Sequence, residues 1–233
     1  GSLDDVRIYS RALGAAEISR MYQQGSAKRA SVNTTGLVGY WRFNEGSGTV
    51  ATDIGSGRNN GTLTGGPSWV TGKYSKGLSF DGVDDYVTGS SGLGLNGATA
   101  GTISLWFKTS TQQTNKYLFS IPKVAATANG FDLNFQGNTT VTFIVKTSSG
   151  DSTQKDVTQT YADGAWHHFV GVYDGANMKI YFDGVQIGGD TAKTGTLDLL
   201  TTEFNIGRFG SALANYYTGL LDEVRIYNRA LGA

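Results

Sequence analysis

The chain has 233 residues, of which 39% are hydrophobic and 12% aromatic, enough for one large domain with a sizeable core. Its formal net charge is zero, which gives no electrostatic basis for binding nucleic acid or an anionic membrane surface. The absence of cysteine excludes disulfide frameworks and thiolate metal sites, and no apolar run reaches the roughly 18–20 residues of a transmembrane helix.

The beginning of the chain predicts a strand, a short helix and a linker. Residues 3–11 (LDDVRIYSR) alternate with period two, as a half-buried strand does. In residues 14–25, apolar side chains recur at the three- and four-residue spacing of an amphipathic helix. Residues 26–36 (SAKRASVNTTG) are small and polar, which is typical of a linker between domains.

From Leu37 onward the sequence predicts a succession of strands with no helix between them. The strands are separated by turns that contain Gly or Asn, apart from a long predicted loop at residues 44–66. Short strands without intervening helices indicate antiparallel pairing, and therefore an all-β fold that is a sandwich or a jelly roll. The predicted strands are residues 37–43, 77–88, 101–109, 116–121, 130–136, 140–147, 166–174, 177–188, 203–209 and 220–229.

The first predicted strand recurs at the end of the chain. Aligned from Leu3 and Leu221, the two segments agree at eleven of thirteen positions and differ only at Asp5/Glu223 and Ser10/Asn228. We interpret residues 1–25 as the tail of a preceding repeat, 26–36 as a linker and 37–233 as one domain of a tandem array. Two similar strands then compete for one position, which predicts a strand-exchanged homodimer or contacts with neighbouring repeats.

Five motifs resemble the laminin G-like jelly rolls of the concanavalin A-like lectin/glucanase superfamily. In chain order they are GLVGYWRFNEGSGTVATDIGSGRNNGTL, KGLSFDGVDDYV, TISLWFKT, DGAWHHFVGVYDGANMKIYFDGVQIG and LLDEVRIYNRAL. The resemblance implies two stacked sheets, neighbouring first and last strands, a bound Ca²⁺, and occurrence as repeated modules of bacterial secreted or surface proteins. It implies no single function, because its members include carbohydrate-binding modules, adhesion repeats and a few catalytic relatives.

Oxygen-bearing side chains near the first and last predicted strands suggest a calcium site. Asp222 has the strand parity of Val224 and Ile226, which predicts an inward carboxylate that needs a partner. Glu45 likewise has the parity of Trp41, and the Gly-rich loop that follows it supplies further oxygens. In the alternative interpretation, these residues form turns and accept backbone hydrogen bonds. The predicted structural Ca²⁺ ligands are Glu45, Asp53, Asn60 and Asp222.

Aromatic and amide side chains in predicted loops are the candidates for sugar contact, because sugar rings stack on aromatic faces beside planar polar groups. The alternative for each is local packing. The predicted ligand-binding residues are Tyr216, Tyr217, Trp69 and Asn215, with Asn129 and Asp132 as secondary candidates.

Catalytic patterns are missing from the sequence. His167 and His168 are adjacent in a predicted strand, so they face opposite sides and cannot serve one site. No Glu is followed two residues later by Asp, as the paired acids of glycosidases with this fold require. Arginine, glutamine and tyrosine residues that a polysaccharide lyase would need are present, but their spacing does not show that they converge.

We therefore predict a non-catalytic carbohydrate- or cell-surface-binding module of a secreted or surface multidomain protein, stabilised by calcium. One alternative is a structural or adhesive spacer repeat that binds no small ligand. Another is a glycoside hydrolase or polysaccharide lyase. The predicted partner is a glycan or another cell-surface ligand, with neither nucleic acid binding nor membrane insertion.

Overall fold

The computed structural model describes residues 32, 34–90, 93–122, 129–150, 152–199, 203–210 and 215–232. The predictions for residues 1–25, and for most of the linker at 26–36, lie outside these ranges. Residues 35–233 form a structural unit of their own, and its described part is built of strands, turns and irregular segments without a helix.

Sixteen strands occur in the described part of the chain, and turns or irregular segments connect them. They are β1 (Leu37–Trp41), β2 (Val50–Ala51), β3 (Gly61–Thr64), β4 (Ser68–Thr71), β5 (Lys76–Asp81), β6 (Tyr86–Gly89), β7 (Gly101–Lys108), β8 (Lys116–Ile121), β9 (Phe131–Gly137), β10 (Thr140–Val145), β11 (Thr153–Thr158), β12 (Trp166–Tyr173), β13 (Asn177–Phe182), β14 (Val185–Ala192), β15 (Phe204–Ile206) and β16 (Thr218–Tyr227).

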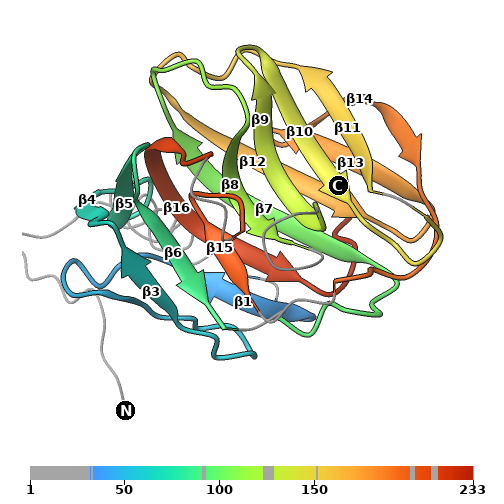
Figure 1. Cartoon of the computed structure of the whole chain (residues 1–233), viewed down its shortest axis with the longest axis horizontal. Helices are drawn as coiled ribbons and strands as arrows, with labels where there is room; N and C mark the ends of the chain where they lie inside the picture. Colours follow the sequence, from blue (N-terminus) through green and yellow to red (C-terminus); the bar gives the residue numbers. More distant parts are fainter. Residues whose placement is uncertain are drawn as a thin grey trace, which may run out of the picture. The chain divides into compact units, whose positions relative to one another are not determined.

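The strands form two eight-stranded antiparallel sheets that stack on each other (Figure 1). Sheet A has the order β14-β13-β12-β7-β16-β5-β4, and β1 also pairs with β16. Sheet B has the order β11-β10-β9-β8-β15-β6-β3-β2. This arrangement confirms the predicted two-sheet sandwich.

Alternating side chains of both sheets fill the space between them. The inward residues of β7 and β9, for example, are all fully buried, and the Phe135 ring stacks on Tyr161 with 3.9 Å between centroids. Burying one such aromatic or branched side chain stabilises the fold by about 1.5–3 kcal/mol. The strand period therefore leaves the alternate residues of each strand on the outer face of its sheet.

β1 and β16 are neighbours, which confirms the implied contact between the first and last strands; Trp41 pairs with Val224. On the other side of β16, Asp222 pairs with Trp106 and Arg225 with Ser104, so β16 contains one extra residue. This β-bulge includes Glu223, whose φ is 53°. The bulge reverses the parity of Asp222 relative to Val224, so the prediction that Asp222 faces inward is wrong.

Three other local predictions are also wrong. The segment predicted as a loop at residues 44–66 contains the short strands β2 and β3. The predicted strand at 77–88 is two strands, β5 in sheet A and β6 in sheet B, joined by a turn in which Gly82 has a φ of 82°. Trp69 was expected in a loop, but it lies in β4, an edge strand.

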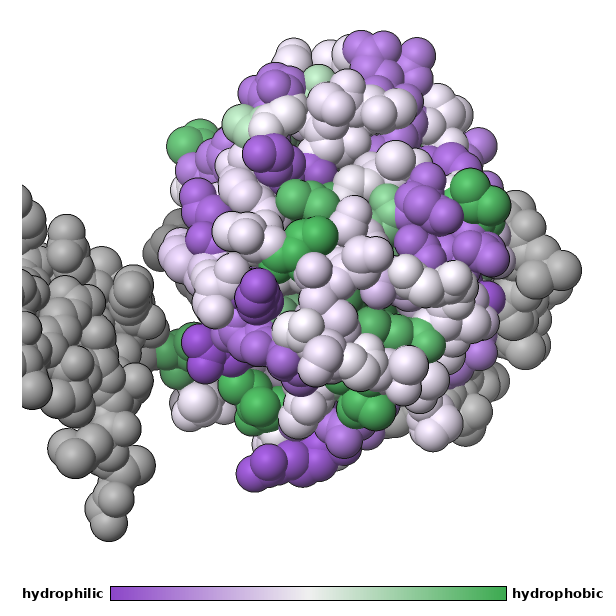
Figure 2. All heavy atoms as spheres, turned by 90° about the vertical axis from the view of Figure 1, so that its left-hand side faces the viewer, coloured by the Kyte–Doolittle hydropathy of each residue, from purple (hydrophilic) through white to green (hydrophobic). Residues whose placement is uncertain are grey.

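The exposed apolar side chains do not form a continuous surface on the face shown in Figure 2. Val50, Ile54 and Val83 are 46–71% exposed. Figure 2 shows the apolar side chains as separate groups, divided by polar ones. Within the described ranges, no helix has the length and apolar character needed to span a bilayer. A functional site is therefore best sought among polar groups.

The close packing between the sheets can be tested at Gly171 of β12. A Cβ atom at this position would lie 2.5 Å from Phe143 Cδ2, a contact that the core cannot accept without movement. We expect Gly171→Ala to lower the free energy of unfolding by about 1–3 kcal/mol, measured by urea denaturation. The matched control is Gly189→Ala in β14, where no atom lies within 4 Å of the new Cβ. If the two variants were equally stable, the close contact between β12 and Phe143 would be contradicted.

Candidate functional site

A group of polar side chains crosses the outer face of sheet B. In β9, Asp132 and Asn134 occupy the two outward positions between three core residues. The register places Asp132 opposite Ser120 of β8, and Ser120 opposite Asn205 of β15. Asn134 lies opposite Tyr117 of β8. We call these five cross-strand neighbours, Tyr117, Ser120, Asp132, Asn134 and Asn205, the polar row.

Several polar atoms of the row are buried and make no hydrogen bond of normal geometry within the described part of the chain. Asp132, Asn134 and Asn205 are all 0% exposed. Gly130 N–H donates to Asp132 Oδ2 at 3.0 Å, and Arg208 Nε donates to Asn205 Oδ1 at 3.0 Å. Asp132 Oδ1, Asn134 Oδ1, Asn134 Nδ2 and Asn205 Nδ2 make no hydrogen bond of normal geometry to any described residue. Each unpaired atom costs about 1–3 kcal/mol, so four in one place are expected to serve a purpose.

Aromatic side chains and one arginine border the polar row. The Arg208 guanidinium lies 3.5 Å from the centroid of the Tyr86 ring, and the Tyr86 and Tyr216 centroids are 6.2 Å apart. On the side of β8, Tyr117 and Phe209 pack with their centroids 4.7 Å apart. Arg208, Tyr117, Phe209 and Tyr216 are each less than one tenth exposed. The arrangement combines flat apolar surfaces with unpaired donors and acceptors.

Burial controls the ionisation of the groups in the row. Burial raises the pKa of Asp132 well above its usual value, although the backbone N–H groups of Gly130 and Ile121 oppose this by stabilising the carboxylate. Burial, followed by the charge of Asp132, raises the pKa of Tyr117, which stays protonated. The Tyr117 hydroxyl donates to Asn129 Oδ1 at 3.0 Å. The secondary candidates Asn129 and Asp132 therefore lie at the same site.

Two of the four predicted ligand-binding residues lie at the polar row, and the other two do not. Tyr216 borders the polar row, and the Asn215 carbonyl beside it accepts a hydrogen bond from Tyr117 N–H at 3.3 Å. Tyr217 is fully buried in the core, because adjacent residues of an extended chain face opposite sides. Trp69 lies on sheet A, where its Nε1 donates to the Gly48 carbonyl at 2.9 Å. The structure thus brings Tyr216 and Asn215 to the row, and neither Tyr217 nor Trp69.

Asp53, one of the predicted calcium ligands, acts as a hydrogen-bond acceptor within the 53–60 loop. Its Oδ1 accepts N–H groups of Tyr40 and Gly55, and its Oδ2 accepts the N–H of Asn59, each at 2.7 Å. Asp53 is fully buried. Three backbone donors already satisfy this carboxylate, and they fasten the loop to β1.

The other predicted calcium ligands also have protein partners. Asn60 Oδ1 accepts Asp53 N–H at 3.0 Å, and Glu45 Oε1 accepts Thr52 N–H at 2.7 Å. Glu45, Asp53 and Asp222 do not belong to any group of three described acidic or histidine side chains within 4.8 Å of one another. The bound calcium ion and its four ligands remain a prediction.

Asp222 lies on the outer face of sheet A, beneath the turn between β4 and β5. It is fully buried, and its Oδ2 accepts Tyr74 N–H at 2.8 Å. Its Oδ1 makes no hydrogen bond of normal geometry to any described residue. Burial, with a contribution from the negative charge of Glu223, raises the pKa of Asp222 to about 7. The carboxyl group therefore fastens the turn between β4 and β5 to β16.

Three acidic side chains do lie close together, in the turn between β5 and β6. Within the described ranges, Asp81, Asp84 and Asp85 place a carboxylate oxygen each within 4.8 Å of the others. Asp85 Oδ2 accepts Asp81 N–H at 2.9 Å, and Asp81 Oδ1 accepts Val83 N–H at 2.8 Å. These hydrogen bonds are those of a tight turn between the two sheets.

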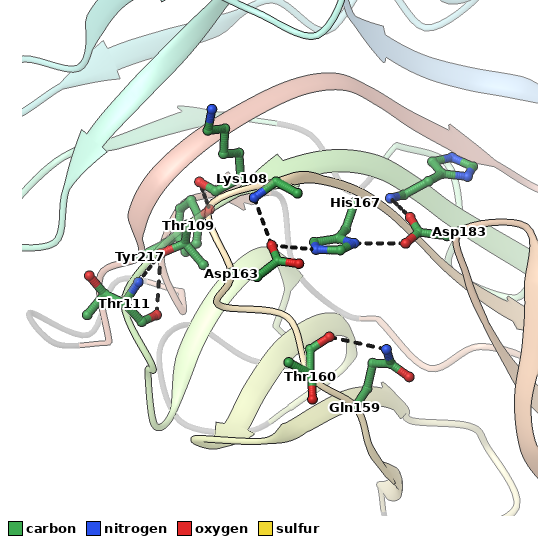
Figure 3. A network of polar contacts seen from close by, with 11 residues as sticks. Lys108, Thr109, Thr111, Gln159, Thr160, Asp163, His167, Asp183 and Tyr217 are labelled. Atoms are coloured by element: carbon green, nitrogen blue, oxygen red, sulfur yellow. Dashed lines mark hydrogen bonds and ion pairs between the residues drawn. The ribbon is translucent and has the colours of Figure 1, made fainter.

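The two histidines face opposite sides of β12, as predicted. His167 lies between two carboxylates, with Nε2 3.0 Å from Asp163 Oδ1 and Nδ1 2.8 Å from Asp183 Oδ2 (Figure 3). Burial opposes its charge, but the two carboxylates outweigh burial and raise its pKa. His168 stacks on Trp106 on the other face, and burial lowers its pKa to about 4. Because both nitrogens of His167 are occupied, this residue cannot act as a base.

The sequence analysis did not identify Ser120, Asn134, Asn205 or Arg208 as site residues. A signal does exist for the first three: each is a short polar residue between apolar neighbours in a predicted strand, as in FDLNF and FNI. Alternation shows that these side chains face outward. It does not show that β8, β9 and β15 are neighbours, which is what assembles the row.

The comparison with protein families agrees with the fold. A family model, Laminin_G_3, described as the concanavalin A-like lectin/glucanases superfamily, matches residues 81–233, which is more than half of the chain. The chain belongs to this superfamily. A search of curated proteins finds no sequence match to this superfamily member.

Solved structures show the same fold at low sequence identity. The binding domain of Paraclostridial Mosquitocidal Protein 1 has a TM-score of 0.66 and 16% identity, over 84% of this chain and 50% of the other. Domain 4 of AbnA, an extracellular GH43 arabinanase from Geobacillus stearothermophilus in complex with arabinotriose, has a TM-score of 0.63 and 20% identity, over 84% and 94% of the two chains.

A third similar structure is the binding domain of Botulinum Neurotoxin DC in complex with SialylT. Its TM-score is 0.63 and its identity 11%, over 85% of this chain and 49% of the other. The superfamily member described here spans about half the length of the toxin binding domains that it matches.

The raised pKa of Asp222 predicts a pH-dependent stability. An acid whose pKa rises from 3.8 to about 7 on folding destabilises the folded state as pH rises through this interval, by on the order of 4 kcal/mol. We expect Asp222→Asn to match wild type near pH 4 and to be more stable at pH 8, measured by urea denaturation. Asp84→Asn, at an exposed acid, is the control. A stability difference that does not change with pH would contradict this assignment.

The raised pKa of His167 predicts the opposite trend. Its ion pairs are fully present below the unfolded pKa of about 6.5, and they are lost as pH rises through the folded pKa. We expect His167→Gln to lower the melting temperature by about 2–4 °C more at pH 5.5 than at pH 9. The control is His168→Gln, whose effect should not differ between these pH values because His168 is neutral at both. Equal losses at both pH values for His167→Gln would refute the charged bridge.

Proposed function

We propose that this chain is a non-catalytic carbohydrate-binding module whose ligand contacts the polar row on the outer face of sheet B. The observation that supports the proposal is a set of four buried side-chain atoms, on Asp132, Asn134 and Asn205, that make no hydrogen bond of normal geometry to a described residue. Sugar hydroxyl groups can pair with each of these atoms and so remove the penalty of their burial. Four of the five side chains of the row are 0% exposed, so a ligand can reach their polar atoms only if neighbouring side chains move.

The side chains around the row also suit a sugar. Pyranose and furanose rings have an apolar face that packs on aromatic rings. Tyr117 belongs to the row, and Tyr86 and Tyr216 border it. Two proteins of the same fold were solved with sugars according to their descriptions, the arabinanase domain with arabinotriose and the neurotoxin domain with SialylT. These two proteins support sugars as the class of ligand that this chain binds.

A binding role is favoured over hydrolysis by the composition of the row. Hydrolysis of a glycosidic bond commonly needs two carboxyl groups on either side of that bond, about 5–9.5 Å apart. Asp132 is the single carboxyl group among the five members of the row. We therefore propose that the row binds its ligand without catalysing a reaction.

Other parts of the sequence-based hypothesis remain predictions alongside the proposed glycan binding. They are the bound calcium ion, a tandem array with contacts or strand exchange between repeats, and a location outside the cell or on its surface. Adding EDTA during thermal unfolding tests the first of these. A bound ion that is specific for the folded state would make the melting temperature fall.

The proposal predicts that Asn134→Leu separates binding from stability. Leucine has nearly the same shape and removes two buried polar atoms that have no partner, so the variant should be as stable as wild type or more stable by about 1 kcal/mol. Glycan binding, measured on a glycan array and by affinity electrophoresis, should weaken at least tenfold. The control for binding is Tyr74→Ala, which removes an exposed aromatic ring from the sheet A side.

Two results would contradict the proposed function. One is wild-type protein that binds no glycan on a broad array. The other is an Asn134→Leu variant that is stably folded and binds as wild type does. A variant that loses stability and binding together would show that Asn134 has a structural role, which also contradicts the proposal.

A further inference from the structure

His167 holds two exposed turns together where β12 begins and β13 ends (Figure 3). Its Nε2 lies 3.0 Å from Oδ1 of Asp163, in the turn before β12, and its Nδ1 lies 2.8 Å from Oδ2 of Asp183, in the turn after β13. We propose that this arrangement is a pH-sensitive switch: when the His167 ring becomes neutral, Asp183 stays bound and the turn of residues 163–165 is released. That turn borders a surface groove.

A neutral histidine ring cannot bind both carboxylates. The protonated ring has two N–H donors, one for Asp163 and one for Asp183. The neutral ring has one N–H, and its other nitrogen presents a lone pair. Because a carboxylate is also an acceptor, loss of the proton places two acceptors against each other at one of the two contacts. One carboxylate must therefore lose its partner.

The contacts of the two carboxylates indicate that Asp163 is the one released. Asp183 uses both of its oxygens on β12: Oδ2 lies on the His167 ring, and Oδ1 accepts the backbone N–H of His168 at 2.8 Å. Asp163 Oδ1 instead accepts the N–H of Ala165 at 2.7 Å, inside its own turn. We therefore expect the neutral ring to keep its proton on Nδ1, bound to Asp183.

The surroundings of His167 favour the charged ring at low pH. Among the described residues, Asp163 and Asp183 are the charged groups that face it. β7 and β13 present the rings of Phe107 and Phe182, with centroids 5.6 and 4.9 Å away. Burial lowers the pKa of His167, but the two carboxylates outweigh burial and raise it above 6.5. The bridge is therefore complete below pH 6.5 and is lost as pH rises through the folded-state pKa.

Release of Asp163 moves the turn, because one oxygen makes both of its contacts. Asp163 Oδ1 faces His167 Nε2 and also accepts the N–H of Ala165. The carboxylate therefore cannot rotate away from the neutral ring without disturbing the contact that closes the turn. Upstream, Tyr161 is fully buried and its hydroxyl donates to the Gln113 carbonyl at 2.9 Å, so the movement ends there.

The released turn borders a groove of about 250 Å³. Residues 108–111, Gly164 and residues 218–220 line this groove. The N–H of Gly164 donates to the Thr109 carbonyl at 3.0 Å, which joins the turn to the opposite lining segment. We expect this hydrogen bond to open when Asp163 leaves His167, so that the groove is wider at high pH than at low pH.

Nitrogen-15 NMR of the His167 ring tests the origin of the switch. Between pH 5.5 and 9, the ring should change from the doubly protonated form to a neutral form with its proton on Nδ1. The shifts of the two ring nitrogens distinguish this form from the other tautomer. A neutral ring with its proton on Nε2 would overturn the inference, because Asp183 would then be the carboxylate that loses its partner.

Amide hydrogen exchange locates the movement. After correction for the intrinsic effect of pH on exchange, the protection of the Gly164 amide should fall at least fivefold between pH 5.5 and 9. The amides of His168, bound to Asp183, and of Gln159, bound to the Thr139 carbonyl, should change less than twofold. Loss of protection at His168 instead of Gly164, at all three amides, or at none would each overturn the inference.

The same substitution at each carboxylate separates their roles. In Asp163→Asn, the new amide can donate to the lone pair on Nε2, so the pH response of Gly164 should disappear. Asp183→Asn should move the proton of the neutral ring to Nε2, so that Asp163 keeps the turn closed. Melting temperatures at pH 5.5 verify that both variants fold, and Asp84→Asn, at an exposed acid, should respond as wild type does. A wild-type pH response in Asp163→Asn would refute the switch.

Discussion

The position of β16 is the constraint on which the rest of this sandwich depends. β16 pairs with β7 along one side, and on the other side it pairs first with β5 and then with β1. At the bulge between these two partners, Glu223 accepts hydrogen bonds from the Tyr40 hydroxyl and the Arg225 guanidinium. Burial, together with Glu223, raises the pKa of Tyr40 to about 12, so its hydroxyl remains a donor. This polar group fixes the register in which the first and last strands meet.

The sequence could predict the sheets but not the bulge or the site. Alternation identified most strands, and the turn residues separated them, because both effects depend on neighbours in the chain. The bulge at Glu223 depends on pairing with β7, and one extra residue placed Asp222 on the opposite face. Tyr216 could be predicted as a candidate because it is an aromatic residue in a predicted loop. Asn134 and Asn205 could not, because their proximity depends on the pairing of strands that are distant in the sequence.

The polar row and the core make opposite contributions to the stability of sheet B. Phe131, Leu133 and Phe135 pack against the other sheet from one face of β9. Asp132 and Asn134 on the opposite face are buried with polar atoms that have no hydrogen bond of normal geometry to a described residue, which lowers stability. A sequence under selection for stability alone would place apolar residues at these positions. The outward positions of β9 are therefore the part of sheet B on which the proposed function depends.

The separation of β1 and β16 from the polar row determines how this domain can be joined to others. Both of these strands belong to sheet A, whereas the row lies on the outer face of sheet B. A polypeptide attached ahead of β1 or behind β16 is tethered at the layer that does not bear the row. Such an attachment leaves the outer face of sheet B unobstructed, so the proposed binding surface would stay accessible in a longer polypeptide.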